Sequence, residues 1–209
     1  MKIRYPMKKL KTPMPIKAVI FDLDGTITRP YLDFDLIRKE IGLSPEQGPL
    51  LEAMEKMPSQ QKLAAEKVLH YHEQKAADES ILNPGAAHTL LTLRQNGILI
   101  GILTRNKKDN AFAVAKKHNL IFDAVVGRED GPVKPDAFGI TFLCEKFGVT
   151  PRQTIMVGDF LFDLLCAKAA GVPSVLLLNN PKAYEFKHHA DFVIDKIDQI
   201  LTIIDQKGD

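Results

Sequence analysis

Two aspartates, Asp22 and Asp24, stand two positions apart directly after a short apolar run, residues 18–21. The run is typical of a buried strand, and the Asp24-Gly25 step is typical of a turn. Alternate side chains of an extended chain point the same way, so both carboxylates can act on one small volume. Two converging acids repel one another unless a cation or proton lies between them. The spacing therefore indicates a metal-assisted phosphoryl-transfer site, although by itself it also fits a strand that ends in an ordinary Asp-Gly turn.

A second polar group, Thr104, Arg105 and Asn106, follows the apolar run 98–103. A hydroxyl followed by free backbone N–H groups at the start of a helix suits a phosphate oxygen. The alternative is that Thr104 is the N-cap of that helix or a simple turn residue. Both interpretations can be partly true, because the same backbone N–H groups serve either partner.

A lysine, Lys134, lies in the proline-bounded segment 131–136. Pro135 restricts the local backbone and favours an extended conformation at Lys134. The lysine would supply a compact positive charge to phosphate and to nearby carboxylates. We expect it to lie in a loop rather than in the core, so that it contributes more to turnover than to folding. The alternative is a solvated surface lysine.

The third group of acids follows the apolar run 154–157, as Gly158-Asp159 and then Asp163. Gly158 is expected to let the backbone turn tightly and to leave Asp159 at the tip of the strand. Asp163 comes one helical turn later, so both acids can face the same volume. The alternative is that the acids only complement the dipole of a helix N-terminus.

The chain from residue 84 onward alternates between helical patterns and short apolar runs. Near-continuous apolar strands separated by helices are typical of a parallel sheet that is covered on both faces. Ligands of such sheets bind beyond the carboxyl ends of the strands, where the three polar groups are placed. The expected strands are 18–21, 98–103, 122–126, 154–157 and 174–178, and the expected helices are 86–96, 109–119, 136–147 and 160–170.

The region between the first strand and residue 83 is polar and helical, with no strand pattern. Apolar residues at helical spacing, separated by glycine and proline breaks, predict helices near 34–41, 50–57 and 60–78. Side chains of this region that could contact a substrate are Arg29, Tyr31, Arg38, His70 and His72.

The composition is that of an ordinary globular protein with one core and a modest insertion. The 209 residues are 45% hydrophobic and 26% charged, with a net charge of +2. This balance gives no reason to expect nucleic acid or membrane partners, and no apolar run approaches the roughly 18 residues of a membrane span. Residues 1–16 are expected to form a basic tail. Cys144 and Cys166 show no metal or disulfide pattern, which favours a cytoplasmic setting.

The order of these motifs resembles the haloacid dehalogenase-like hydrolase superfamily over residues 18–178. The segments 83–85 (Asn-Pro-Gly) and 102–106 resemble its phosphoglycolate phosphatase-like branch. The resemblance implies a three-layer, Rossmann-like α/β core made of residues 17–27 and 83–209. It also implies an inserted α-helical cap, residues 28–82, shorter than the cap of many relatives.

The resemblance also implies a role for each motif residue. Asp22 would attack phosphorus to form an aspartyl-phosphate, and Asp24 would protonate the leaving group and then activate water. The residues that would bind the phosphoryl group are Thr104, Arg105, Asn106 and Lys134. Mg²⁺ would be held by Asp22, the backbone carbonyl of Asp24 and Asp159, with Gly158 and Asp163 in support.

The resulting hypothesis is a cytoplasmic, Mg²⁺-dependent phosphatase acting on a small phosphorylated metabolite, as a monomer or homodimer. Relatives that cleave carbon–halogen or carbon–phosphorus bonds depart at the position of Asp24, so this residue favours phosphate esters. Two alternatives stay open. A phosphotransferase or phosphomutase shares every core motif, and a non-catalytic phosphate-binding module would be favoured by loss of a motif acid, although none is lost.

Overall fold

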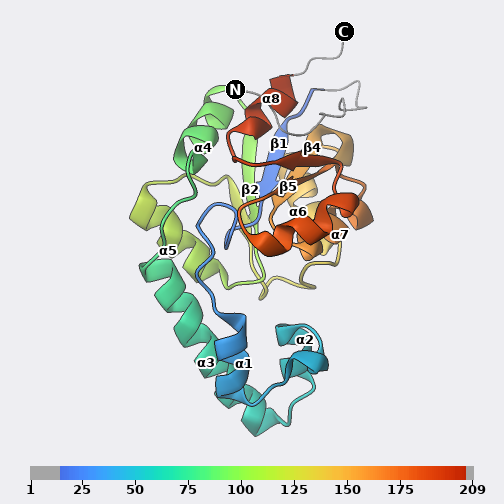
Figure 1. Ribbon diagram of the computed structural model, residues 1–209. Helices are drawn as coiled ribbons and strands as arrows, with labels where there is room; N and C mark the ends of the chain where they lie inside the picture. Colours follow the sequence, from blue (N-terminus) through green and yellow to red (C-terminus); the bar gives the residue numbers. More distant parts are fainter. Residues whose placement is uncertain (1–14, 206–209) are drawn as a thin grey trace. The chain divides into compact units, whose positions relative to one another are not determined.

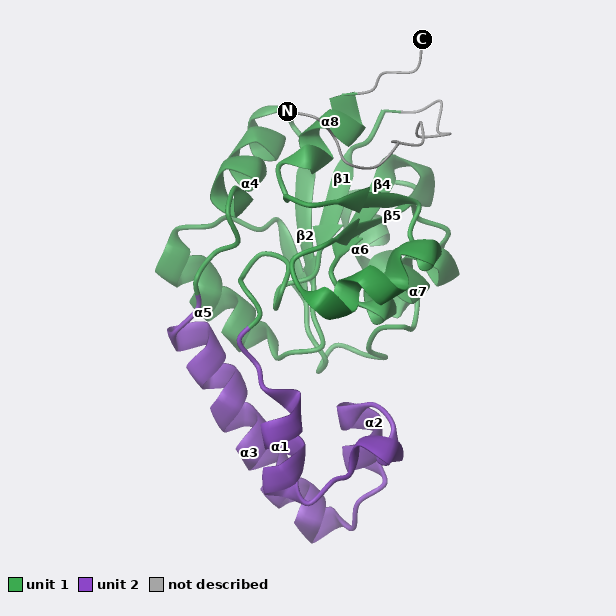
Figure 2. Cartoon of the chain, viewed as in Figure 1, with its two compact units in different colours: residues 1–30, 81–209 green, residues 31–80 purple. Residues whose placement is uncertain are grey.

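The computed structural model describes residues 15–205, which form two compact units. The core unit comprises the residues up to Pro30 and those from Ile81 onward, and the cap unit is Tyr31–Ser80. Figure 2 shows the core unit in green and the cap unit in purple. The predicted cap limits, 28 and 82, lie within three residues of these boundaries. The predicted basic tail lies outside the described residues except for its last two, and the second of these, Ile16, is buried.

Six parallel strands form one sheet in the order β3-β2-β1-β4-β5-β6. This is the strand order of doubly wound α/β folds, so the predicted fold class is confirmed. The strands are β1 Ala18–Phe21, β2 Leu99–Leu103, β3 Ala124–Val126, β4 Thr154–Gly158, β5 Ser174–Leu177 and β6 Phe192–Ile194.

Helices cover both faces of this sheet (Figure 1). Helix α4 packs on β2 and α5 on β3, whereas α6 packs on β1, β2 and β3, and α7 on β4 and β5. The helices are α4 Ala86–Gln95, α5 Lys108–His118, α6 Phe138–Phe147, α7 Leu161–Ala170 and α8 Gln199–Asp205, with 3₁₀ helices η2 Pro151–Gln153 and η3 Pro181–His189.

The central strands are buried on both faces because their sequences are almost continuously apolar. Ile20 and Met156 lie in a cluster with Leu143 of α6 and Cys166 of α7, all at or near zero exposure. All five predicted strands are present. The sequence analysis missed η3, β6 and α8. Strand β6 has only three residues, too few to show an alternation of apolar and polar side chains.

The cap unit has its own small core between three helices, α1 Phe34–Ile41, α2 Leu50–Glu55 and α3 Ser59–Asp78, with a 3₁₀ helix, η1 Pro45–Gln47. Asp33 caps the start of α1 by accepting from two backbone N–H groups, and Gly42 ends it in the left-handed conformation. Ile37 of α1, Met54 of α2 and Leu69 of α3 are buried together. The three helices that the sequence predicts for the cap are therefore present.

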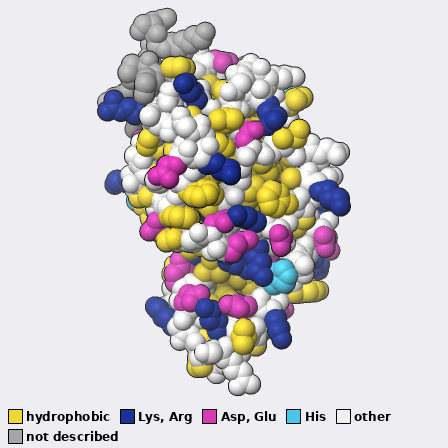
Figure 3. Space-filling model, turned by 180° about the vertical axis from the view of Figure 1, so that it is seen from behind, with side chains coloured by type: hydrophobic (Ala, Val, Ile, Leu, Met, Phe, Trp, Pro, Cys, Tyr) yellow, Lys and Arg dark blue, Asp and Glu magenta, His cyan; other side chains and the backbone are white. Residues whose placement is uncertain are grey.

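The surface carries both signs of charge. On the face shown in Figure 3, lysine and arginine side chains alternate with aspartates and glutamates, and hydrophobic side chains show between them. Among residues 15–205, no helix is both long enough and apolar enough to cross a membrane. Cys144 and Cys166 are buried free thiols.

Candidate active site

The candidate site lies where the strand order changes direction, between β1 and β4. These strands run side by side in parallel, with Phe21 opposite Val157. The backbone N–H of Asp22 then donates to the carbonyl of Val157 at 2.9 Å, which continues the pairing one residue past the strand. Asp22 and Asp159 are thereby brought to the same edge of the sheet, at the position where doubly wound folds bind ligands.

Lys134 joins the acids of two different motifs. Its Nζ lies 2.5 Å from Oδ1 of Asp22 and 2.6 Å from Oδ1 of Asp163. The lysine is only 3% exposed. Sequence analysis expected a loop lysine outside the core. The segment is a loop, but the expected exposure of the side chain was wrong. The side chain is buried because its ammonium pairs with two buried carboxylates.

Three carboxylates converge beside this lysine. Asp22, Asp159 and Asp163 each place one oxygen so that all three oxygens lie within 4.8 Å of one another, and all three residues are buried. Asp163 also accepts from the backbone N–H of Phe160 through Oδ2, at 3.1 Å, so it supports the start of α7 as well. Asp163 thus makes the contact expected of a capping residue, and the same side chain lies in the acid cluster.

The donor chemistry of this group fits a small divalent cation. Carboxylate oxygens are the ligands that Mg²⁺ prefers, usually together with water and substrate phosphate. Among residues 15–205, Lys134 places one positive charge beside three buried carboxyls, so a further cation would balance the cluster. Asp22 and Asp159 match the ligands predicted for Mg²⁺. The group also contains Asp163, which was predicted only as a supporting residue, and does not contain the Asp24 carboxylate.

Burial dominates the electrostatics of the cluster. It raises the pKa of Asp22 to about 7, opposed by the Lys134 ammonium and assisted by the other acids. Burial likewise raises the pKa of Asp159 well above its usual range, and the Asp22 carboxylate adds to the rise. For Lys134, burial alone would lower the pKa, but Asp163 and Asp22 outweigh it and leave the pKa above its ordinary value. The lysine therefore stays charged, whereas Asp22 and Asp159 need a further cation to ionise fully.

Two glycines allow the acids to approach this closely. A Cβ on Gly158 would overlap the side chain of Asp163, and a Cβ on Gly25 would lie 2.9 Å from Cγ of Asp159. Gly158 is still part of strand β4 and is absent from the positive-φ residues. The prediction that it makes a tight turn was therefore wrong: it is needed for the space that its missing side chain leaves to Asp163.

Asp24 points to a different set of partners. Its Oδ2 accepts from Nδ2 of Asn106 at 3.2 Å, and Oδ1 of Asn106 accepts from Nδ2 of Asn110 at 2.7 Å. These two hydrogen bonds fix the orientation of the Asn106 amide, with its nitrogen toward Asp24. Burial raises the pKa of Asp24, and the hydrogen bond from Asn106 works in the opposite direction.

The two residues before Asn106 have local contacts that the sequence could not show. Oγ1 of Thr104 accepts from the backbone N–H of Asn106 at 2.9 Å, and α5 begins only at Lys108. Thr104 is thus a turn residue and not an N-cap. Arg105 donates to the backbone carbonyl of Lys134, and its guanidinium lies 4.6 Å from the ring centroid of Phe162. The hydrogen bond connects Arg105 to the loop that contains Lys134, residues 131–136.

Three asparagines around the site were missed as site residues. Nδ2 of Asn83 lies 2.8–3.0 Å from the carbonyls of Gly25, Thr26 and Thr28 and so holds the turn after β1. Asn179 and Asn180 follow β5 and contact Gly25 and Asp159. Their place after a parallel strand was the available signal, because every such strand ends at the same edge.

Three of the cap side chains that were predicted to contact a substrate form contacts within the cap unit. Arg38 donates to the carbonyls of Ser44 and Gly48, His72 lies 2.8 Å from Glu40, and Tyr31 donates to Glu79. These contacts tie the helices and loops of the cap together. They give each of the three side chains a structural role that spacing alone did not indicate.

Comparison with known proteins agrees with this geometry. The family model described as haloacid dehalogenase-like hydrolase matches residues 16–171. The chain therefore belongs to the haloacid dehalogenase-like hydrolases, as the order of its motifs predicts. The matched range begins just before β1 and ends just after α7, so it contains all the predicted site residues.

Individual relatives cover most of the chain. An uncharacterized hydrolase of Saccharomyces cerevisiae, YOR131C, is 30% identical, with 91% of this chain and 90% of the yeast protein aligned. A phosphoglycolate phosphatase of Pasteurella multocida is 32% identical over 65% of this chain and 62% of its own. The crystal structure of a hydrolase from Pseudomonas syringae superposes with a TM-score of 0.71 at 21% identity, covering 91% and 98% of the two chains. This last likeness shows a shared fold.

Proposed function

We propose that this hydrolase is a Mg²⁺-dependent phosphatase that cleaves a small organic phosphomonoester through an aspartyl-phosphate on Asp22. The observation that carries the proposal is the buried cluster in which Lys134 bridges Asp22 and Asp163 beside Asp159. A phosphate dianion attacked by a carboxylate needs charge compensation, and this cluster is built to provide it. The similarity to a phosphoglycolate phosphatase supports a phosphate ester as substrate.

Asp22 is the nucleophile of the proposed reaction. A carboxylate oxygen of Asp22 bonds to phosphorus while the bond from phosphorus to the ester oxygen breaks. Lys134 favours the charged form of the Asp22 carboxylate that attack requires and so offsets part of the rise in pKa that burial causes. When bound by Asp22, Asp159 and the backbone carbonyl of Asp24, Mg²⁺ would supply positive charge to the carboxylate and the phosphate oxygens.

Asp24 moves the proton in both halves of the reaction. It gives a proton to the leaving ester oxygen, and then takes one from the water that attacks the acyl phosphate, so that inorganic phosphate leaves and Asp22 is restored. Burial raises the pKa of Asp24, which favours the protonated form needed first. The bond from Asn106 holds the carboxylate in place for both transfers.

The remaining predicted residues bind the phosphoryl group or hold those that do. In this proposal the turn that contains Thr104 and Asn106 binds the phosphate oxygens, and Lys134 neutralises the charge of these oxygens. Arg105 was predicted to contact phosphate, and that stays a prediction; its contacts support a role in fastening the Lys134 loop. Assembly as a monomer or homodimer and a cytoplasmic location also stay predictions.

The test is turnover of p-nitrophenyl phosphate with Mg²⁺ and after its removal by EDTA. We expect hydrolysis that requires Mg²⁺ and is absent in Asp22→Asn. A panel of phosphoglycolate, sugar phosphates and nucleotides would then identify the substrate. A protein that binds phosphate without any turnover would support the non-catalytic module, and transfer of phosphate to a second sugar in place of water would support the phosphotransferase.

A further inference from the structure

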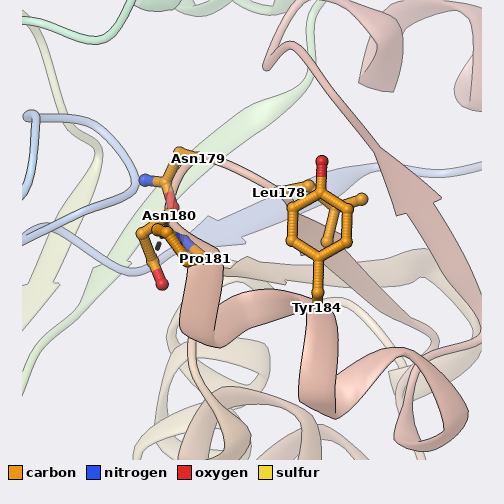
Figure 4. A pocket seen from close by; sticks show the side chains of 5 residues that line it. All are labelled: Leu178, Asn179, Asn180, Pro181 and Tyr184. Atoms are coloured by element: carbon orange, nitrogen blue, oxygen red, sulfur yellow. Dashed lines mark hydrogen bonds between the residues drawn. The ribbon is translucent and has the colours of Figure 1, made fainter.

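Two consecutive asparagines after β5 form a bridge between the two segments that carry the acids. Nδ2 of Asn180 donates to Oδ2 of Asp159 at 3.0 Å and to Oδ1 of Asn179 at 2.8 Å. Nδ2 of Asn179 in turn donates to the carbonyl of Gly25, in the turn after β1. Figure 4 shows the pair at the edge of a hollow lined by Leu178, Asn179, Asn180, Pro181 and Tyr184, with the Asn179 amide nitrogen directed toward the blue segment that follows β1.

The hydrogen bonds of the pair fix the direction of both amides. Oδ1 of Asn180 accepts from the backbone N–H of Ala183 at 3.0 Å, in the first turn of η3. The Nδ2 of Asn180 must then face Asp159, because a carboxylate only accepts hydrogen bonds. A flipped Asn180 amide would place its oxygen against the Asp159 carboxylate oxygen, and no hydrogen bond could form between them. Oδ1 of Asn179 is taken by Asn180, so its nitrogen must face Gly25. These hydrogen bonds therefore form one series with a single donor-to-acceptor direction, which runs between η3 and the turn after β1.

Asp159 is held at both of its oxygens by this arrangement. Oδ1 accepts from Oγ1 of Thr26 at 3.4 Å, and Oδ2 accepts from Asn180 at 3.0 Å. The backbone of Gly25 lies directly against the same carboxylate, where a Cβ would not fit. The bond from Thr26 is near the limit of a hydrogen bond, so Asn180 is the closer of the two donors. Rotation of the Asp159 carboxylate is thus set mainly by Asn180.

We propose that Asn180 is a positioning residue for the metal site, acting through Asp159, with Asn179 linking that residue to the turn after β1. This inference rests on the proposed function, in which Asp159 is a Mg²⁺ ligand. Partners that orient a metal-binding carboxylate contribute to metal affinity although they do not touch the ion. Both ends of the bridge are fixed, one by β5 and η3 and the other by Asn83, which also donates to the Gly25 carbonyl.

The test is Mg²⁺ binding by titration calorimetry on the substrate-free protein, comparing wild type with Asn180→Ser. Serine keeps an oxygen that can cap η3 but is too short to reach Asp159, so folding should be nearly unchanged. We expect the dissociation constant for Mg²⁺ to rise by about tenfold. In assays, the Mg²⁺ concentration for half-maximal activity should rise by a similar factor, while kcat at saturating Mg²⁺ stays close to that of wild type.

Two further variants separate this role from a general disturbance of the segment. Tyr184→Ala alters the same hollow through a ring whose centroid lies 4.2 Å from Nζ of Lys187, and it should bind Mg²⁺ like wild type. Asn179→Ser keeps the contact from Asn180 to Asp159 but removes the link to Gly25, and it should weaken Mg²⁺ binding by a smaller factor; it also serves if Asn180→Ser does not fold. Equal Mg²⁺ affinity in wild type and both asparagine variants would overturn the positioning role alone. Failure of the wild-type protein to bind Mg²⁺ would overturn the inference together with the metal dependence of the proposed function.

Discussion

The ammonium nitrogen of Lys134 lies 2.5 Å from Oδ1 of Asp22, although the two residues are 112 positions apart in the sequence. The same nitrogen contacts Asp163, so one buried cation links the loop before α6 to the end of β1 and to the first turn of α7. Buried charges persist only where they are paired, and removal of one partner leaves the other unpaired. Lys134 is therefore part of the folded core as well as part of the candidate site.

The burial of Lys134 changes what its replacement should do. Lys134→Met keeps the volume of the side chain but removes the charge that offsets Asp22 and Asp163. We expect turnover of p-nitrophenyl phosphate to fall roughly a hundredfold or more, and the midpoint of thermal unfolding to fall by roughly 5–10 °C. This differs from the expectation from sequence, in which folding is almost unchanged, because the structure shows a lysine that is only 3% exposed.

A matched control is Lys108→Met, because Lys108 is also paired, with Asp130 at 2.5 Å, but lies partly exposed. Exposed ion pairs contribute little to stability, so this variant should unfold close to wild type and keep its activity. Equal thermal midpoints for the two methionine variants would show that the Lys134 pairs do not support the fold.

Gly25 gives a prediction about space at the acid cluster. Its φ is +94°, and a Cβ there would also meet the carboxylate of Asp159. Gly97 has a φ of +71° but open space around it. Gly97→Ala should therefore cost only the backbone strain of about 1–2 kcal/mol. Gly25→Ala should cost more and should also displace Asp159, raising the Mg²⁺ concentration needed for activity.

The comparison of these two alanine variants separates strain from collision. Thermal unfolding measures the stability of each, and a Mg²⁺ titration of activity measures the site. If both variants lose the same stability and keep wild-type Mg²⁺ dependence, the close approach of Gly25 and Asp159 has no bearing on the metal site.

The sequence could predict which residues meet, but not how their side chains are used. Asp22 and Asp159 were found because parallel strands all end at one edge of the sheet, so position in the chain fixes position in space. Lys134 was found from its place in the series of motifs. The direction of the Asn106 amide was not predictable, since it depends on Asn110, in the first turn of α5. Asn180 occupies the same edge, but its contact with Asp159 depends on the course of η3, which has no periodic pattern.

The raised pKa of Asp22 predicts how pH affects the metal-free protein. The ordinary pKa of the group is 3.8, and burial raises it to about 7 in the folded state. Between these values the folded protein holds a proton that the unfolded chain has released, so stability falls as pH rises through this range. A divalent cation can take the place of the proton. Mg²⁺ should therefore raise the midpoint of thermal unfolding more at pH 8 than at pH 5.

Unfolding curves recorded with EDTA and with excess Mg²⁺ at both pH values check this prediction. Asp22→Asn serves as the control, because its amide does not titrate and its stability in EDTA should change less between the two pH values. An increment from Mg²⁺ that is the same at pH 5 and pH 8 would contradict a cation bound by the buried carboxylates.

The two acids of the first motif should fail in different ways when replaced. Asp22→Asn removes the proposed nucleophile, so it should abolish turnover and leave no phosphate on the protein. Asp24→Asn removes a proton donor and acceptor, a role worth about 10²–10⁴-fold in rate. With p-nitrophenol as the leaving group the first protonation matters little, whereas activation of water still needs the base. Asp24→Asn should therefore slow dephosphorylation more than phosphorylation and accumulate the aspartyl-phosphate.

Mass spectrometry of acid-quenched protein distinguishes these outcomes. We expect a phosphate adduct on the peptide that contains residues 21–26 in Asp24→Asn, and none in Asp22→Asn. Asn106→Leu adds a graded case, because it leaves both acids in place but removes the amide that holds Asp24 at 3.2 Å. It should accumulate less adduct than Asp24→Asn and more than wild type. An adduct on Asp24, or one that persists in Asp22→Asn, would reverse the roles assigned to the two acids.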